Sequence, residues 1–154
     1  TQVSAVANAV LRNEAIFDYA TTYFYKNPNL GNTIPTITDA DYTDFKQFLK
    51  TKKFNLDTET EVNLKKTLAA AKKEKIDESI TAEYQQLLNA IQKSEWNALD
   101  KNQKEIKNLL LDEIIKRYQY QEGLYQYYIK SNPEIKKAVS VLSTSAEYIS
   151  ILKL

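Results

Sequence analysis

The chain has 154 residues, of which 27% are charged, and its 21 lysines and arginines against 20 aspartates and glutamates leave a formal net charge of +1. This length suits one compact domain with a core of ordinary size, so we expect residues 1–154 to form a single domain. The balanced charge provides no global field towards nucleic acid or an anionic membrane, and any partner is expected to be recognised locally.

The residue types that are missing exclude several kinds of chemistry. The sequence contains no histidine and no cysteine, so an imidazole base, a thiol nucleophile and the Glu-x-x-His pairs of a carboxylate-bridged metal centre are all excluded. Arg12 and Arg117 are the only arginines, which argues against a nucleic-acid interface. We expect no catalytic residue, no cofactor and no metal.

Two further absences concern processing and membranes. No apolar run approaches the roughly 20 residues that a membrane-spanning helix needs, so no membrane insertion is expected. Methionine is absent, even at position 1, and the first residues show neither a charged segment nor an apolar signal segment. These features indicate a piece of a longer protein.

Helix is predicted nearly throughout the chain, because two glycines and three prolines are too few to separate a set of β-hairpins. Over residues 3–25 apolar side chains recur at helical spacing, and the run KNPNLGNTIP at 26–35 ends them and is expected to be the main loop. Thr38 and Asp41 resemble a capping box. They predict a short second helix whose inner face carries Tyr42, Phe45, Phe48 and Leu49. The inner positions of the first segment are Val6, Val10, Phe17, Ala20 and Phe24.

The middle of the chain is predicted to be helical but its division is left open. Thr58 and Glu61 resemble a second capping box, and the segment from Thr58 to Lys93 is either one bent helix or two. A cluster of lysines within it, interrupted and followed by acidic residues, is interpreted as a solvated face rather than an anion site. Trp96 is expected at the next break, as a half-buried lid on a helix junction.

A long helix is predicted from about Lys101 to Lys130, where Asn132 and Pro133 end it. It would span about 45 Å at 1.5 Å per residue and form the spine of the domain. Gly123 inside it suggests either a small bend or the close approach of another helix, and we favour close approach. The predicted fold is therefore all-α, an irregular multi-helix bundle with one long helix in the C-terminal half. Its inner stripe is expected to comprise Ile106, Leu110, Ile114, Tyr118, Tyr125 and Tyr128.

The tyrosines near this helix's end are expected to lie on two faces. Tyr118, Tyr125 and Tyr128 are expected to fill the core. Tyr120 and Tyr127, seven residues apart, share another face and are candidates for a protein or peptide contact. Packing within the domain remains the alternative for that pair. Glu113 and Arg117, one helical turn apart, are expected to form an ion pair on the helix flank.

Three segments carry a resemblance to a known family. They are FDYATTYFYKNPNL (17–30), TDADYTDFKQFLKTKKF (38–54) and LLLDEIIKRYQYQEGLYQYYIKSNPEIKKAVSVL (109–142). Together they resemble the C-terminal helical region of carboxy-terminal processing peptidases, the tail-specific serine proteases, in the form found in Bacteroidetes. The similarity is most specific in residues 113–118 and around Gly123 and Pro133, whereas residues 65–102 match only in pattern.

The resemblance implies a non-catalytic accessory domain. In that family a Ser-Lys dyad lies in a catalytic domain and a PDZ domain captures the substrate, and both would lie outside this chain. Expected partners are the catalytic and PDZ domains of the same polypeptide, a protein or peptide substrate, or a second copy. The periplasm or cell envelope is the implied location. A stand-alone helical interaction module remains the alternative.

Overall fold

The computed structural model describes residues 3–31, 33–54, 56–144 and 149–150. These residues form seven α-helices and one short 3-10 helix, with no strand among them, which confirms the all-α prediction. The helices are α1 (Ala5–Arg12), α2 (Ala15–Lys26), η1 (Pro28–Leu30), α3 (Asp39–Thr51), α4 (Glu59–Glu74), α5 (Asp77–Lys101), α6 (Gln103–Ser131) and α7 (Pro133–Ser143).

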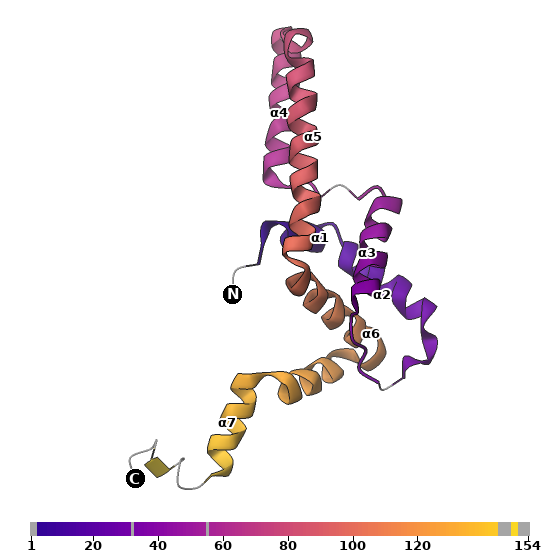
Figure 1. Ribbon diagram of the computed structural model, residues 1–154, viewed down its shortest axis with the longest axis vertical. Coiled ribbons are helices and arrows are strands. Elements are labelled where there is room, and N and C mark those ends of the chain that lie inside the picture. Colours follow the sequence, from indigo (N-terminus) through magenta and orange to yellow (C-terminus); the bar gives the residue numbers. More distant parts are fainter. Residues whose placement is uncertain (1–2, 32, 55, 145–148, 151–154) are drawn as a thin grey trace.

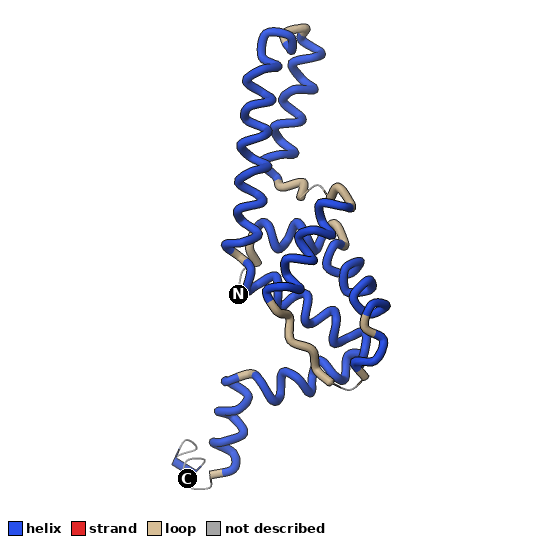
Figure 2. Tube along the Cα trace, turned by 45° about the vertical axis from the view of Figure 1, so that its right-hand side comes forward, coloured by secondary structure: helices blue, strands red, loops and turns tan. Residues whose placement is uncertain are grey.

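The molecule is elongated, with a central body and two projections (Figure 1). The body contains α1, α2, α3 and the first part of α6. A hairpin of α4 and α5 rises from one end of it, and the last part of α6 leads to α7 at the other end. Figure 2 shows the same three parts after a turn of 45° and the long loop between α2 and α3 along the body.

The first helical segment is divided, so its predicted inner face is partly wrong. Glu14 adopts a left-handed backbone conformation, with φ of 56°, between α1 and α2. The turn changes which side of α2 faces inward. Ile16 and Tyr19 are buried in the core, whereas Phe17, predicted to lie inside, is 56% exposed.

The core of the body is formed by residues of α1, α2, α3, the end of α5 and the first part of α6. The predicted capping box of Thr38 and Asp41 is present, and it starts α3 so that Tyr42, Phe45 and Leu49 are buried. Tyr19 meets Phe45 edge-on, with ring centroids 5.2 Å apart. Tyr42 donates a hydrogen bond of 2.7 Å to the carbonyl of Leu99, which joins α3 to the end of α5.

The segment from Thr58 onward is two helices joined by a tight turn. Lys75 lies in the left-handed region, with φ of 63°, and separates α4 from α5. The predicted break near Trp96 does not exist, because α5 is continuous to Lys101. Trp96 is nevertheless partly buried, packs against the body core and lies under the ammonium group of Lys50 at 5.5 Å. The lysines expected on a solvated face, Lys72, Lys73 and Lys75, are exposed.

The predicted spine helix is bent at Tyr120. Tyr120 has φ of 56° and ψ of −164°, values that interrupt α6. The buried stripe therefore ends near Tyr118, and Tyr125, predicted to fill the core, is 61% exposed. We call this bend, residues 119–123, the elbow.

Gly123 is explained by the elbow and not by the approach of another helix. A Cβ added at Gly123 would lie 2.1 Å from Cβ of Gln119, the residue just before the irregular backbone. The bend brings these two positions together, so the favoured explanation from the sequence, close packing of a second helix, is wrong. The alternative of a bend is correct.

Asn132 and Pro133 end α6 and start α7. The side-chain oxygen of Asn132 accepts hydrogen bonds from the main-chain N–H groups of Glu134 and Ile135, at 2.8 and 3.2 Å. Pro133 takes the first position of the helix, where its missing N–H costs nothing. Beyond this cap α7 leaves Val139 and Leu142 largely exposed.

Arg117 joins α6 to α2. Its guanidinium donates to the Phe17 carbonyl at 2.7 Å and to Thr21 Oγ1 at 2.8 Å, and it lies 4.3 Å above the Phe17 ring. The same group pairs with Glu113 at 3.0 Å. Next to it, the hydroxyl of Tyr118 donates to the Asn27 carbonyl at 2.6 Å. The predicted pair of Glu113 and Arg117 therefore exists within a larger contact between two helices.

Gly123→Ala tests the elbow by the sign of its effect on stability. In an unbroken helix the change would stabilise the protein by about 1 kcal/mol. Because the added methyl collides with Gln119, we expect a loss of about 1–3 kcal/mol in the free energy of unfolding instead. Urea denaturation measures the difference. Gln126→Ala, at an exposed site in the same helix, should stay within about 0.5 kcal/mol, and stabilisation by Gly123→Ala would argue for a straight α6.

Arg117→Ala should destabilise the protein by about 2–4 kcal/mol, because the Phe17 carbonyl and the half-buried Thr21 hydroxyl on α2 lose charged donors and the packing of the arginine side chain is lost as well. Arg117→Lys keeps the charge but lacks the planar fork, so it should recover less than half of the loss. Urea melts of the three proteins provide the comparison. An alanine variant with an unchanged denaturation midpoint would show that the contact contributes nothing.

Candidate functional site

The two tyrosines proposed as a contact face are separated in space. Tyr120 is 79% exposed at the elbow. Tyr127 is half-buried and packs against a small second core whose buried members are Leu111, Ile115 and Leu124. The expected common face therefore does not form. Tyr128 lies beside Tyr127, and its hydroxyl donates to the Asp112 carboxylate at 2.7 Å across the bend.

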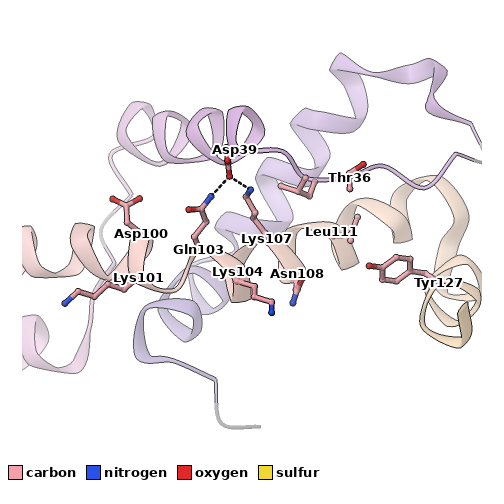
Figure 3. A pocket seen from close by; sticks show the side chains of 11 residues that line it. Thr36, Asp39, Asp100, Lys101, Gln103, Lys104, Lys107, Asn108, Leu111 and Tyr127 are labelled. Carbon is pink, nitrogen blue, oxygen red and sulfur yellow. Dashed lines mark hydrogen bonds and ion pairs between the residues drawn. The ribbon is translucent and has the colours of Figure 1, made fainter. Parts of the chain in front are cut away.

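The elbow creates a hollow on its inner side, shown in Figure 3. It has a volume of about 630 Å³ and lies between the end of the loop before α3, the start of α3, the first part of α6 and Tyr127. A smaller hollow shares Lys104, Asn108, Leu111 and Tyr127 with it and continues to Asn132. We call the two together the elbow groove. The larger hollow is lined by Thr36, Ile37, Asp39, Asp100, Lys101, Gln103, Lys104, Lys107, Asn108, Leu111 and Tyr127.

The carboxylates of the groove are already paired. Asp39 accepts from Lys107 at 2.7 Å and from Gln103 at 2.8 Å (Figure 3). The hydrogen bond from Lys107 and its charge hold the pKa of the Asp39 carboxyl below its usual value. Asp100 pairs with Lys46 at 2.6 Å.

At the other end of the groove the Asp112 carboxylate is occupied by Tyr128. Burial, together with this carboxylate, raises the pKa of Tyr128 to about 12, so the hydroxyl remains a donor at neutral pH. Burial also raises the pKa of Asp112, although the hydrogen bond from Tyr128 opposes that shift.

Several cationic and amide side chains of the groove lack a bonding partner among the described residues. Within the part of the chain that the structure describes, the side chains of Lys101, Lys104 and Asn108 form no hydrogen bond or ion pair. In Figure 3 Lys104 and Asn108 point to the side of α6 opposite Asp39. The groove therefore offers unpaired positive charge and one unpaired amide next to apolar surface.

Two glutamates at the root of the hairpin are buried, which the sequence did not predict. Glu61 is fully buried and Glu95 is 7% exposed. Glu61 was expected to complete a capping box with Thr58, yet its carboxylate instead accepts from Gln92 and Lys65, each at 3.1 Å. The Thr58 hydroxyl donates to Glu95. The single hint in the sequence is the spacing of Glu61 and Lys65, which suits an i, i+4 pair.

The pKa values of these two carboxyl groups are shifted in opposite directions. Burial and the neighbouring Glu61 raise the pKa of Glu95. Burial also acts to raise the pKa of Glu61, but the hydrogen bonds from Gln92 and Lys65 and the charge of Lys65 outweigh it and lower that pKa. The other carboxylate oxygen of Glu61 is buried and has no hydrogen-bond partner among the described residues.

Glu95→Gln tests the raised pKa of Glu95 through the pH dependence of stability. A raised folded-state pKa means that the stabilisation by Glu95 is present at low pH and is lost as pH rises through that pKa. The wild type should therefore lose stability between about pH 5 and about pH 8, and the glutamine variant, which keeps a donor at all pH values, should lose less. Urea midpoints at both pH values measure the slopes.

Glu83→Gln, at an exposed site on the same helix, is the matched control for this experiment. The change of its urea midpoint with pH should equal that of the wild type. Equal slopes for the wild type and Glu95→Gln would show that Glu95 is ionised in the folded protein.

Other site types find no support in the described residues. No group of three or more histidine, cysteine, aspartate or glutamate side chains among them could hold a metal ion. None of the described helices is both long enough and apolar enough to cross a membrane.

The comparisons with known proteins identify one family. Residues 6–142 match the family model described as the C-terminal helical domain of a probable PDZ-protease. The comparisons with curated proteins and with solved structures gave no match. The family match covers most of the chain and confirms the resemblance to the C-terminal region of a processing peptidase. The chain belongs to the family of C-terminal helical domains of probable PDZ-proteases.

Proposed function

We propose that this chain is a non-catalytic accessory domain of a tail-specific serine protease of the cell envelope. It docks on the catalytic and PDZ domains of the same polypeptide and helps to enclose a protein substrate or to pair subunits. The match to the C-terminal helical domain of a probable PDZ-protease is the observation that carries this proposal. The location in the periplasm or envelope rests on the resemblance to carboxy-terminal processing peptidases.

The environments of four of the serines support a structural role. Ser79, Ser131 and Ser143 each donate their hydroxyl to a main-chain carbonyl of the same helix or its cap, at 2.7 Å. Ser4 caps α1. A serine nucleophile needs a base within hydrogen-bond reach and preorganised oxyanion donors. These four hydroxyl groups serve the backbone instead, so we assign the Ser-Lys dyad of the protease to its catalytic domain.

The shape of the molecule supports a role in docking. The hairpin and α7 project from opposite ends of the body (Figure 1), so two separated surfaces are available to a larger protein. Val139 and Leu142 on α7 are 53% and 67% exposed, and Ile129 before it is 55% exposed. Apolar side chains grouped on one arm are typical of a surface that a partner covers.

Deleting residues 1–154 from the whole protease tests this proposal. The dyad would remain intact, so cleavage of a short unstructured peptide should fall by less than about threefold, which is under 1 kcal/mol of activation free energy. Cleavage of a large protein substrate, or assembly measured by light scattering, should fall much more. The isolated chain should not hydrolyse either substrate.

Two outcomes would contradict the proposal. Hydrolysis by the isolated chain that is lost on replacing one of its own serines would make it an enzyme. Unchanged stability, assembly and cleavage of the large substrate after deletion would favour a stand-alone interaction module.

A further inference from the structure

The wall of the elbow groove contains main-chain groups without partners. Thr36 and Ile37 belong to a non-helical segment at residues 33–38. No hydrogen bond joins the main-chain N–H or C=O groups of these two residues to any other residue that the structure describes. Main-chain N–H and C=O groups without partners can pair with those of a second chain.

Part of the lining of the groove is apolar. Leu111, on α6, is 8% exposed and belongs to the second core. Ile37 and Tyr127 pack against that core and also line the groove. An apolar side chain that entered here would bury its surface against these three residues, with a gain of about 25 cal/mol per Å².

The charges of the groove favour an anionic group in the ligand. Asp39, Asp100 and Asp112 are each paired with a donor from the protein. Lys101 and Lys104 have no partner among the described residues. A carboxylate placed beside Lys104 would find an unpaired ammonium group, whereas each of these three carboxylates already has a donor from the protein.

We infer that the elbow groove binds an extended polypeptide segment that presents an apolar side chain next to an acidic one. The main chain of the segment would pair with Thr36 and Ile37, its apolar side chain would pack on Leu111 and Tyr127, and its carboxylate would meet Lys104. This inference rests on the proposed function. Under that function, the segment is part of an unfolded protein substrate of the protease.

A polypeptide fits these three features better than other ligands. A folded helical partner has no free main-chain groups to pair with residues 36–37, because its own helices use them. Nucleic acid is read chiefly by arginine forks and stacked aromatic rings, whereas the unpaired cations of the groove are lysines. An unfolded chain supplies main-chain donors and acceptors, apolar side chains and carboxylates together.

The backbone at Tyr120 agrees with a binding role. Its φ of 56° with ψ of −164° lies in a region that residues other than glycine rarely occupy. Such conformations persist where the surrounding structure holds them, and they gather at ligand-binding sites. Here the conformation turns Tyr127 and Tyr128 back towards the first part of α6 and so creates the groove.

The test measures binding of a fluorescein-labelled peptide of about ten residues to the 154-residue chain by fluorescence anisotropy. In this peptide leucine and valine alternate with serine around one central glutamate. A second peptide carries glutamine in place of the glutamate. A third has N-methyl groups on its central amides, which removes the donors that would pair with Thr36 and Ile37. We expect the first peptide to bind about tenfold more tightly than either of the others.

Two exposed lysines provide matched variants. Lys104→Glu places a negative charge in the groove, and Lys73→Glu makes the same change in net charge on the distant hairpin. We expect Lys104→Glu to weaken binding of the glutamate peptide by at least about tenfold and Lys73→Glu to leave it unchanged. Circular dichroism checks that both variants fold.

Several results would overturn the inference. They are an absence of binding up to about 1 mM peptide, equal binding by the two lysine variants, and undiminished binding of the N-methylated peptide. Dimerisation that Lys104→Glu abolishes would assign the groove to a second copy of the chain instead. Because the measurement uses the chain alone, its failure leaves the effect of deleting the domain from the protease as a separate question.

Discussion

The contact between α2 and α6 determines how the rest of this structure is arranged, and Arg117 is at its centre. One guanidinium satisfies a main-chain carbonyl and a hydroxyl on α2, an ion pair on its own helix and the face of an aromatic ring. A planar group with several fixed donors can do this, whereas a lysine cannot. With α6 fixed against α2 up to Tyr118, the chain beyond the elbow is free to leave the body. The groove, the second core and the arm that ends in α7 all depend on this change in the direction of the chain.

The parts of the fold that the sequence predicted well are those decided by local periodicity. Tyr42, Phe45 and Leu49 repeat at helical spacing after a capping box, and all three are buried. The buried stripe of Ile106, Leu110 and Ile114 was predicted for the same reason and is correct. The assignment failed at Tyr125 because periodicity assumes an unbroken helix, and a single irregular residue, Tyr120, rotates everything that follows it. Gly123 marked this place, but a glycine alone does not distinguish a bend from a close contact.

The site could not be predicted for a different reason. The elbow groove joins residues 36–39 to residues 100–127, which are far apart in the sequence and carry no motif. The buried pair of Glu61 and Glu95 runs against the usual expectation that glutamate is exposed. Its burial becomes understandable only when Thr58, Lys65 and Gln92 are seen around it. The groove and the buried glutamate pair both depend on which residues, distant in the sequence, come into contact. The individual segments do not reveal those contacts.

The continuity of α5 has a mechanical consequence. Its 25 residues extend from the tip of the hairpin to the core of the body without a break, a length of about 37 Å. Few tertiary contacts hold the tip, whereas the other end is tied by the Tyr42 bond to Leu99 and by the packing of Trp96. Amide protons near Lys75 should therefore exchange with solvent through small local openings, and those near Leu99 only through disruption of the core. A force that a partner applies to the hairpin tip would be transmitted directly to the core, because α5 has no flexible joint between the tip and the core.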